Sequence, residues 1–403
     1  MTTQRILIIG AGYAGLMTAL RLSKQVKKHD VSVMLINAGD TFVERIRLHQ
    51  RLTGQQLPVY QIDKFLQGTG VEFVQGMVES ILPDEQCIRV QTMTGIKDLP
   101  YYRLVIATGS KTDTTVVPGI REYAHTLDEK SVAALRVTLP DIAANQGKCL
   151  VIGGGLTGIE AATELAETFP GLQVALATRH KLGADLSEVA QAHLQKRFAA
   201  LNITLYEQTT IKAVENGYTV TISDDETHIP FDACVWTAGF VANSLAKDNH
   251  LRVNAQGQMM VNATMQSFSH PAIYATGDAA AFLPEAGLSI RMACATAMPM
   301  GAHVADNLLR ELNNETPEPF AFSYAVRCIS LGRQQGLIQI VNGDDSVKEQ
   351  ILTGRKAGLI KEGICKYTIK MLQLEKRLPG FYPWFKGHTI EAPIEVFSQP
   401  LSP

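Results

Sequence analysis

The chain opens with short apolar runs that alternate with glycine-rich turns and small-residue segments. Residues 6–9 are all aliphatic, and a short run of this kind that ends at a turn is typical of a buried strand. The turn has the spacing G-x-G-x-x-G over residues 10–15, and residues 14–22 have the composition of a closely packed helix. A second apolar run follows and ends at Asn37. The pattern predicts a strand, a tight turn, a helix and a second strand.

Glycine at these three positions has a physical purpose. Gly10, Gly12 and Gly15 permit a tight turn, a close approach of the backbone to a pyrophosphate, and close packing of the helix on the strand. The N-terminus of the helix then offers free N–H groups and a positive dipole end to the phosphates. The position of Asn37 is where such a unit contacts a ribose.

The same plan recurs in the middle of the chain. The stretch KCLVIGGGLTGIEAATELAE again gives an apolar strand, the glycines Gly153, Gly155 and Gly158, and a helix, and the next apolar strand ends at Thr178. One such motif is weak evidence for nucleotide binding because glycine-rich turns are common. Two copies, each between a strand and a helix, are strong evidence. Two dinucleotide sites predict two cofactors that meet, most simply a flavin and a nicotinamide.

Three further apolar strands run into turns of small residues, at Thr108–Gly109, Ala238–Gly239 and Gly277–Asp278. An aspartate at such a turn can bind a ribityl or ribose hydroxyl, although a tight turn capped by the aspartate is the simpler alternative for any single copy. Together with the two glycine motifs, these turns predict an α/β fold. We expect two Rossmann-like dinucleotide-binding domains, with a C-terminal α+β extension.

Charge and cysteine content narrow the function further. The 37 basic and 39 acidic residues give a net charge of −2, which disfavours a nucleic-acid partner. None of the six cysteines form a close pair, as is typical of a reducing cytosol. No apolar run reaches the roughly 20 residues of a transmembrane helix, and no ligand spacing indicates a metal. We therefore expect a cytoplasmic protein, with membrane contact, if any, at the membrane surface.

The motifs, taken together, resemble those of the two-dinucleotide-binding-domain flavoproteins of the pyridine nucleotide-disulfide oxidoreductase superfamily. The stretches GAGYAG, VIGGGLTGIEAATELA, VWTAGF, HPAIYATGDAA and GAHVADNL look most similar to those of type II NADH dehydrogenases, the NADH:quinone oxidoreductases. This resemblance implies FAD on the first glycine motif and NADPH or NADH on the second. It implies an FAD-binding domain in two parts, 1–117 and 246–312, an inserted NAD(P)H-binding domain, 118–245, and a C-terminal region, 313–403.

The resemblance also implies positions for the site residues. Those expected at FAD lie on the first glycine loop, at the ribose position and at the later turns: Gly10, Gly12, Ala14, Gly15, Asn37, Arg45, Thr108, Gly109, Gly277, Asp278 and Ala295. Those expected at NAD(P)H are Gly153, Gly155, Leu156, Thr157, Gly158, Glu160, Thr178, Arg179, Ala238 and Gly239. Glu160 should lie near the contact of nicotinamide and flavin, and a helix that begins near 294 should direct its N-terminus at the flavin.

The chain departs from the family pattern in four places. Asn37 and Thr178–Arg179 stand where an acidic residue usually holds a ribose, and Ala295 stands where a glutamine usually lines the quinone pocket. The segment 42–50 is more polar than its counterpart. Its Arg45, Arg47 and His49 could approach the flavin or an anionic acceptor, and a surface segment paired with Glu44 is an equally good interpretation.

The residues indicate how electrons would leave the flavin. Related disulfide reductases have a redox-active cysteine pair in the helix after the first ribose strand, and residues 38–65 contain no cysteine. We therefore expect an FAD-dependent NAD(P)H dehydrogenase that reduces a quinone or quinone-like acceptor, with Glu160 and His49 as candidates for proton supply. The alternatives are a reductase of a small electron-transfer protein and a redox-sensing protein that acts through partners.

The C-terminal region changes in composition. Residues 348–388 contain nine Lys or Arg and three Glu. Ile364, Tyr367, Met371, Leu374 and Leu378 have helical spacing, and the lysines 361, 366, 370 and 376 fall outside this stripe. A basic amphipathic helix followed by aromatic residues suits peripheral contact of residues 361–388 with the cytoplasmic face of a membrane. The stripe could equally cover the protein itself or a partner subunit in a homodimer.

The second ribose position also predicts a nucleotide preference. An acidic residue there would repel a 2′-phosphate, whereas Thr178 removes the repulsion and Arg179, with His180 or Lys181, could pair with the phosphate. A solvated basic turn that selects nothing is the simpler alternative. We expect NADPH to be accepted at least as well as NADH.

Overall fold

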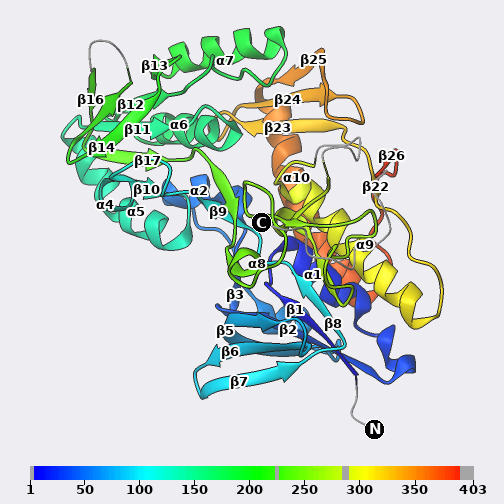
Figure 1. Ribbon diagram of the computed structural model, residues 1–403. Coiled ribbons are helices and arrows are strands. Elements are labelled where there is room, and N and C mark those ends of the chain that lie inside the picture. Colours follow the sequence, from blue (N-terminus) through cyan, green and yellow to red (C-terminus); the bar gives the residue numbers. More distant parts are fainter. Residues whose placement is uncertain (1–3, 223–226, 284–289, 391–403) are drawn as a thin grey trace.

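The computed structural model describes residues 4–222, 227–283 and 290–390. The chain folds into two sheets of similar plan, one mixed with a parallel core and one wholly parallel, joined by a C-terminal sheet and a long C-terminal helix (Figure 1). The predicted α/β class with two Rossmann-like units is confirmed. Residues 1–3 and 391–403 of the predicted domain ranges lie outside the described residues.

The first sheet is built around the first glycine motif. Its seven strands lie in the order β20–β8–β1–β2–β5–β6–β7, and the pairings from β20 to β5 are parallel. The strands are β1 (Gln4–Ile9), β2 (Val31–Asn37), β5 (Glu72–Leu82), β6 (Cys87–Thr92), β7 (Gly95–Pro100), β8 (Arg103–Ile106) and β20 (Ile273–Ala275). Because β20 is separated from β8 by the whole second unit, this domain is discontinuous in sequence.

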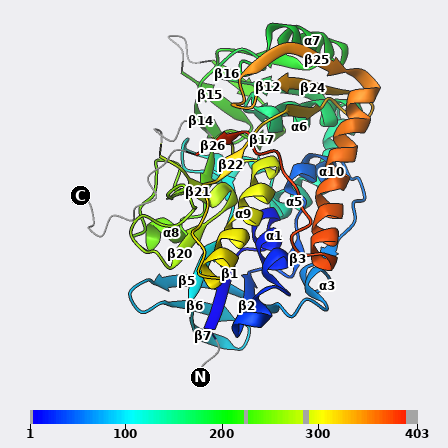
Figure 2. The same cartoon turned by 90° about the vertical axis from the view of Figure 1, so that its right-hand side faces the viewer.

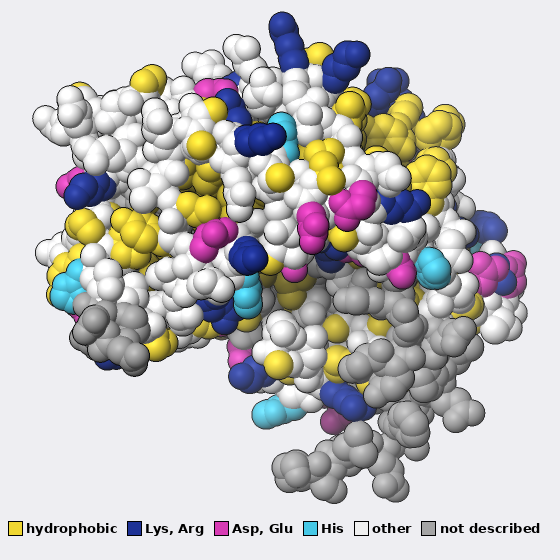
Figure 3. Space-filling model, turned by 90° about the horizontal axis from the view of Figure 1, so that it is seen from above, with side chains coloured by type: hydrophobic (Ala, Val, Ile, Leu, Met, Phe, Trp, Pro, Cys, Tyr) yellow, Lys and Arg dark blue, Asp and Glu magenta, His cyan; other side chains and the backbone are white. Residues whose placement is uncertain are grey.

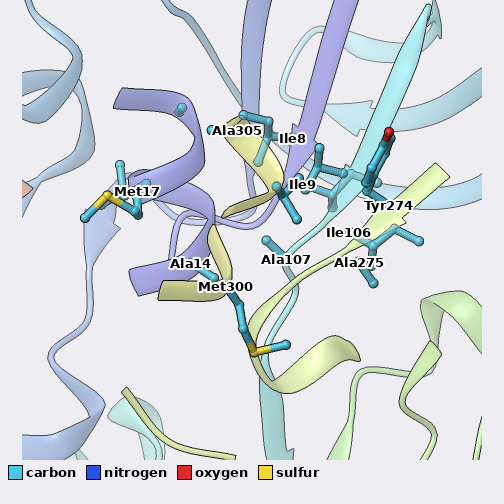
Figure 4. Close-up of a cluster of buried hydrophobic side chains, with 14 of the residues drawn as sticks. Ile8, Ile9, Ala14, Met17, Ile106, Ala107, Tyr274, Ala275, Met300 and Ala305 are labelled. Atoms are coloured by element: carbon cyan, nitrogen blue, oxygen red, sulfur yellow. The ribbon is translucent and has the colours of Figure 1, made fainter. Parts of the chain in front are cut away.

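Two helices cover one side of the sheet and complete its core. Helix α1 (Tyr13–Leu22) is buried along its whole length and packs against α9 (Cys294–Leu312). Figure 4 shows Ile8 and Ile9 of β1, Met17 of α1 and Met300 of α9 in one apolar cluster with the end of β8. Because both helices begin near the carboxyl ends of the strands, their N-termini lie at the same edge of the sheet.

The second sheet repeats the plan around the second glycine motif. Its five strands lie in the order β10–β17–β11–β12–β13 and are all parallel. The strands are β10 (His125–Thr126), β11 (Lys148–Ile152), β12 (Gln173–Ala177), β13 (Thr204–Tyr206) and β17 (Ala233–Trp236). The helices are α4 (Ile120–Tyr123), α5 (Glu129–Ala144), α6 (Leu156–Thr168) and α7 (Glu188–Ala200). A small antiparallel sheet is formed by β14 (Ile211–Glu215), β15 (Tyr218–Thr221) and β16 (His228–Pro230).

Short elements connect the two units. Strands β9 (Ser110–Thr112) and β18 (Phe240–Ala242) pair with each other where the chain enters and leaves the second unit.

The other short elements lie outside the second unit. They are η1 (Val26–His29), β3 (Thr41–Phe42), η2 (Arg45–Arg47), α2 (Leu48–Leu52), β4 (Tyr60–Gln61), α3 (Ile62–Leu66), α8 (Leu245–Asp248), β19 (Met259–Met260), η3 (Gly277–Ala279) and β21 (Ala280–Ala281).

The C-terminal region belongs to both cores. It comprises β22 (Ala321–Phe322), β23 (Val326–Ser330), β24 (Gly336–Val341), β25 (Val347–Thr353), α10 (Gly354–Arg377) and β26 (His388–Thr389). Side chains of β23 and β24 share a core with the second unit, whereas the last turns of α10 share a core with the first. Figure 2 shows α10 running along the side of the molecule from the C-terminal sheet towards α3.

A buried ionic network holds α10 on the first unit. The guanidinium of Arg21 on α1 contacts Asp306 of α9 at 2.6 Å and the fully buried Glu375 of α10 at 3.1 Å. Glu375 also accepts hydrogen bonds from the backbone N–H groups of Gly380 and Tyr382. Each partner of a buried charge must be present, because an unpaired buried charge is strongly destabilising.

The structure corrects the expected face of α10. Of the predicted stripe, Met371 is buried and Leu374 is partly buried against the first core, whereas Ile364, Tyr367 and Leu378 are exposed. The buried face includes Cys365, Ile369, Leu372 and Glu375 instead. Lys361, which falls outside the predicted stripe, lies inside the protein against a carboxylate of α6. None of the helices in the described ranges has the length and hydropathy that crossing a bilayer requires.

Candidate active site

The two glycine loops have the same internal geometry. A Cβ on Gly10 would lie 2.4 Å from the carbonyl oxygen of Ala107, and one on Gly15 would lie 1.8 Å from that of Gly10. A Cβ on Gly153 would lie 2.6 Å from the hydroxyl of Thr237, and one on Gly158 would lie 1.9 Å from the carbonyl oxygen of Gly153. The first and third glycines of each motif are therefore required by the packing of the fold.

The middle glycine of each motif is different. Gly12 and Gly155 have no heavy atom within 4 Å of a Cβ position, and both have negative φ angles that any residue adopts. Each immediately precedes a helix whose N-terminus has no side-chain cap. Packing does not explain these two glycines, whereas close approach of a phosphate does. The residues present therefore fit a dinucleotide on each motif.

Asn37 tightens the first loop. Its side-chain oxygen accepts a hydrogen bond from the backbone N–H of Ala11 at 3.0 Å, and its amide donates to the carbonyl of Gly39 at 2.9 Å. The residue is partly exposed beside the glycine loop. Asn37 is thus placed at the edge where a ribose is expected, with part of its hydrogen-bonding capacity already used by the loop.

The turn after β20 lies at the same edge of the first sheet. The carboxylate of Asp278 accepts a hydrogen bond from the hydroxyl of Ser110 at 2.6 Å, and Arg45 donates to the carbonyl of Ser110. Burial raises the pKa of Asp278, and the hydroxyl of Ser110 and the charge of Arg45 oppose that rise. Gly277 has a φ of +64° and lies against Ala14 and Ala297, so the turn touches both helix N-termini.

Helix α9 begins at this turn. Its cap residue, Ala293, has extended backbone and accepts hydrogen bonds from the N–H groups of Thr296 and Ala297. The helix spans 19 residues and lies against α1, where a Cβ on Gly301 would be 2.3 Å from the carbonyl oxygen of Ala14. Cys294 and Ala295 thus occupy the first turn, where the helix dipole favours negative charge.

Glu160 is the centre of a buried polar cluster between the two units. It lies on α6 and accepts hydrogen bonds from the ammonium of Lys361 and, at 2.9 Å, from the backbone N–H of Ser330. Its second oxygen lies 3.7 Å from Nδ1 of His49 on α2. Burial alone would raise the pKa of Glu160, but Lys361, His49 and the N–H of Ser330 hold it below its usual range. The carboxylate is therefore ionised.

The neighbouring turn of α6 carries a second ionic link. The fully buried Glu164 contacts Nε of Arg333 at 2.7 Å and accepts hydrogen bonds from Thr53 and Gln55, which follow α2. Arg333 belongs to the turn between β23 and β24. Glu160 and Glu164 together tie α6 to the α2 segment and to the C-terminal sheet.

The charged side chains of the polar segment 42–50 point to different partners. Arg47 contacts Glu44 at 3.3 Å and Glu362 of α10 at 2.7 Å, so the pairing with Glu44 is observed. Both Glu44 and Arg47 are buried, so the expectation that this pair lies on the surface was wrong. His49 faces Glu160, whereas Arg45 lies at the Asp278 turn. Sequence periodicity missed Lys361 and Glu362, because nothing local shows which carboxylate or guanidinium a helix 24 residues long will meet.

The second ribose position lies beside a cavity. Thr178 is buried against Gly154, while Arg179, His180 and Lys181 line a cavity of about 350 Å³ together with Gln191 and Gln208. In the part of the chain that the structure describes, no carboxylate pairs with Arg179. Figure 3 shows basic side chains spread over this end of the molecule among acidic and apolar ones. The described residues contain no group of three or more His, Cys, Asp or Glu that could hold a metal ion.

Comparisons with known proteins agree with this geometry. The family described as pyridine nucleotide-disulphide oxidoreductase matches residues 4–306. A type II NADH:quinone oxidoreductase from Staphylococcus haemolyticus (strain JCSC1435) is 28% identical over 400 residues, covering 90% of this chain and 94% of that protein. These findings confirm the resemblance predicted from the motifs.

Two solved structures share the fold at low identity. A sulfide:quinone oxidoreductase from Aquifex aeolicus superposes with a TM-score of 0.83 at 19% identity, covering 99% of this chain and 100% of that one. The protein named NDH2 from Plasmodium falciparum, in complex with NADH, superposes with a TM-score of 0.78 at 15% identity. The match covers 95% of this chain and 100% of that one. At these identities the likeness shows the arrangement of the elements and nothing finer.

The two kinds of glycine predict opposite effects of one added methyl group. Gly155→Ala should leave the thermal unfolding midpoint unchanged and weaken NADPH binding by roughly tenfold or more, because the methyl occupies the phosphate's space. Gly158→Ala should lower the midpoint, because its Cβ meets a backbone carbonyl. Differential scanning fluorimetry and equilibrium titration measure both effects. Unweakened binding by a folded Gly155→Ala protein would show that no phosphate contacts this glycine.

Proposed function

Because the chain belongs to the pyridine nucleotide-disulphide oxidoreductase family, we propose that it is an FAD-dependent NAD(P)H dehydrogenase that passes electrons to a quinone or quinone-like acceptor. The observation that supports this most is the doubled glycine loop, each copy with a middle glycine that packing does not require. Residues 38–65 also contain no cysteine to receive electrons from a flavin. The similar Staphylococcus protein is named for the same reaction.

The first unit would hold the flavin. Gly12 and the N-terminus of α1 would face the pyrophosphate, Asn37 a ribose, and the Asp278 turn the remaining hydroxyls. When bound, FAD supplies the capacity to take two electrons from a nicotinamide and release them to a second substrate. The first turn of α9, with Cys294 and Ala295, would place the positive end of a helix dipole beside the ring that gains charge.

The second unit would hold the nicotinamide cofactor. Gly155 and the N-terminus of α6 would face its pyrophosphate, and the cavity beside Arg179 would receive the adenine ribose. Among the described residues no carboxylate pairs with Arg179, so its guanidinium could bind a phosphate, and Thr178 brings no negative charge to repel one. We therefore propose that NADPH is used at least as well as NADH.

The C-terminal helix offers a surface to a membrane. Its outer face exposes Leu359, Ile360, Ile364 and Tyr367, and Phe381 and Phe385 are exposed after it. Lys356, Lys366 and Lys370 are exposed on the same helix. Apolar side chains flanked by lysines suit an anionic lipid surface, which would also supply a lipid-soluble quinone. A homodimer through this face is the competing use of the same side chains.

The function is tested by following the flavin absorbance without oxygen. Addition of NADPH or NADH to the FAD-loaded protein should bleach the flavin, and a short-chain ubiquinone or menaquinone should restore its absorbance within the instrument's time range. If the flavin is reduced but ferredoxin or rubredoxin reoxidises it and no quinone does, the acceptor is a protein. Failure of both nucleotides to bleach the flavin would contradict the proposal as a whole.

The basic turn makes a prediction about nucleotide choice. Replacing Thr178 by Glu and Arg179 by Ala should lower the ratio of kcat/KM for NADPH to that for NADH by about 10- to 100-fold, because a carboxylate would repel the 2′-phosphate. Replacing Lys196 by Ala, an exposed residue on α7 of the same unit, serves as a control for general loss of positive charge. An unchanged ratio in the double variant would mean that this turn is only a solvated surface.

The exposed face of α10 makes a separate prediction. Replacing Leu359 and Ile364 by Glu should reduce sedimentation with vesicles of phosphatidylglycerol and phosphatidylcholine by roughly tenfold or more, since two apolar contacts are lost. Val137 on α5 is 75% exposed, and its replacement by Glu is the matched control. If neither variant changes sedimentation but the first converts a dimer to a monomer, the face is a subunit interface.

A further inference from the structure

His49 occupies an unusual place for a histidine. It lies on α2, the segment where related disulfide reductases have their cysteine pair, and its side chain is only 3% exposed. Its neighbours Leu48 and Leu52 pack into the core of the second unit, so α2 is fixed against α6. The imidazole is thus held at the junction of the two units by residues on either side of it.

The surroundings select one form of the ring. Nδ1 lies 3.7 Å from the carboxylate of Glu160, and a proton on Nδ1 is favoured beside that negative charge. The lone pair then lies on Nε2. This atom is buried and, among the described residues, has no hydrogen-bond partner. A buried polar atom without a partner in the protein is accounted for by a ligand or water that completes it.

Positively charged groups outnumber carboxylates among the charges that act on the ring. Glu160 faces it from α6, Lys361 from α10, Arg333 from the turn after β23, and Arg47 from the residue before α2. Burial lowers the pKa of His49 to about 4, and the carboxylate of Glu160 opposes that shift only in part. The ring is therefore neutral at neutral pH, and one further negative charge nearby would favour its protonation.

The Lys361–Glu160 pair of this cluster acts electrostatically on the first turn of α9. Burial raises the pKa of the Cys294 thiol, and the charges of Lys361 and Glu160 also act on it, so these groups lie within electrostatic range of the first turn of α9. That turn is where a reduced flavin would add negative charge. Lys361 and Ser330 bind the Glu160 carboxylate, so this carboxylate is a poor proton donor. Nε2 of His49, in contrast, has no hydrogen-bond partner among the described residues.

We propose that His49 is the proton-holding group of this site, taking up one proton when the bound flavin is reduced and giving it to the acceptor, with Glu160 and Lys361 as positioning residues. The inference rests on the proposed function. In the balanced reaction NAD(P)H, one proton and a quinone give NAD(P)⁺ and a hydroquinone. The nicotinamide supplies two electrons and one proton, and the second proton is the one that His49 holds.

The test separates the two half-reactions. In wild-type protein, anaerobic reduction by one equivalent of NADPH at pH 7 should take up about one proton per flavin, measured with an indicator dye. His49→Gln should bind FAD and be reduced at a similar rate, but should take up almost no proton. Its reoxidation by a short-chain quinone should be slower by about 100-fold, the usual contribution of a positioned acid.

His303 provides a matched control. It is also buried, and burial lowers its pKa to about 4 as well, but its Nε2 is engaged with Glu318 and Asn307 in the first unit. His303→Gln should leave proton uptake unchanged. The pH dependence of the flavin midpoint potential should differ from wild type only in His49→Gln and in Glu160→Gln, which removes the positioning carboxylate.

Two outcomes would overturn the proposal. One is full proton uptake and wild-type reoxidation by His49→Gln. The other, which needs no variant, is a histidine-labelled NMR spectrum of wild-type protein in which no imidazole gains a proton on flavin reduction. If wild-type protein takes up the proton but no quinone reoxidises it, the assigned acceptor is wrong while the role of His49 stands.

Discussion

The assembly of this protein depends on the buried ion pair between Lys361 and Glu160. Two charges taken out of water cost several kcal/mol unless each has a close partner and further hydrogen bonds. Glu160 gains both only when α6, β23 and α10 meet, because its contacts are Lys361 and the N–H of Ser330. One carboxylate therefore fixes the second dinucleotide unit, the C-terminal sheet and the C-terminal helix relative to one another.

The distance in sequence between interacting residues explains which features could be predicted from the sequence and which could not. The glycine loops were predictable because their requirement is local: Gly15 must avoid the carbonyl of Gly10, five residues away. The partners of α10 were not, because Glu362 meets Arg47 across 315 positions. Periodicity places Lys361 off the apolar stripe, which ordinarily means solvent. Only the tertiary arrangement shows that this lysine neutralises a buried carboxylate.

Burial and charge divide the work among neighbouring polar residues. Glu160 is ionised and paired with Lys361, and Arg47 is paired with Glu44 and Glu362. His49 is neutral, and its Nε2 has no hydrogen-bond partner among the described residues. On this account electron transfer needs no nucleophile, and the protein contributes two cradles for dinucleotides, a helix dipole and a place for one proton. In the proposed function, the basic turn at Arg179 would affect which nucleotide binds and would have no part in the later steps.

The most direct measurement is a double-mutant cycle on Glu160 and Lys361, read in the rate of flavin reoxidation. Removing either partner alone, as Glu160→Gln or Lys361→Met, leaves the other buried charge unpaired and the His49 ring misoriented. The account predicts that the double variant loses no more than the worse single variant, so that the two effects couple strongly. Effects that simply add would contradict it, because they would show that Lys361 and Glu160 act independently.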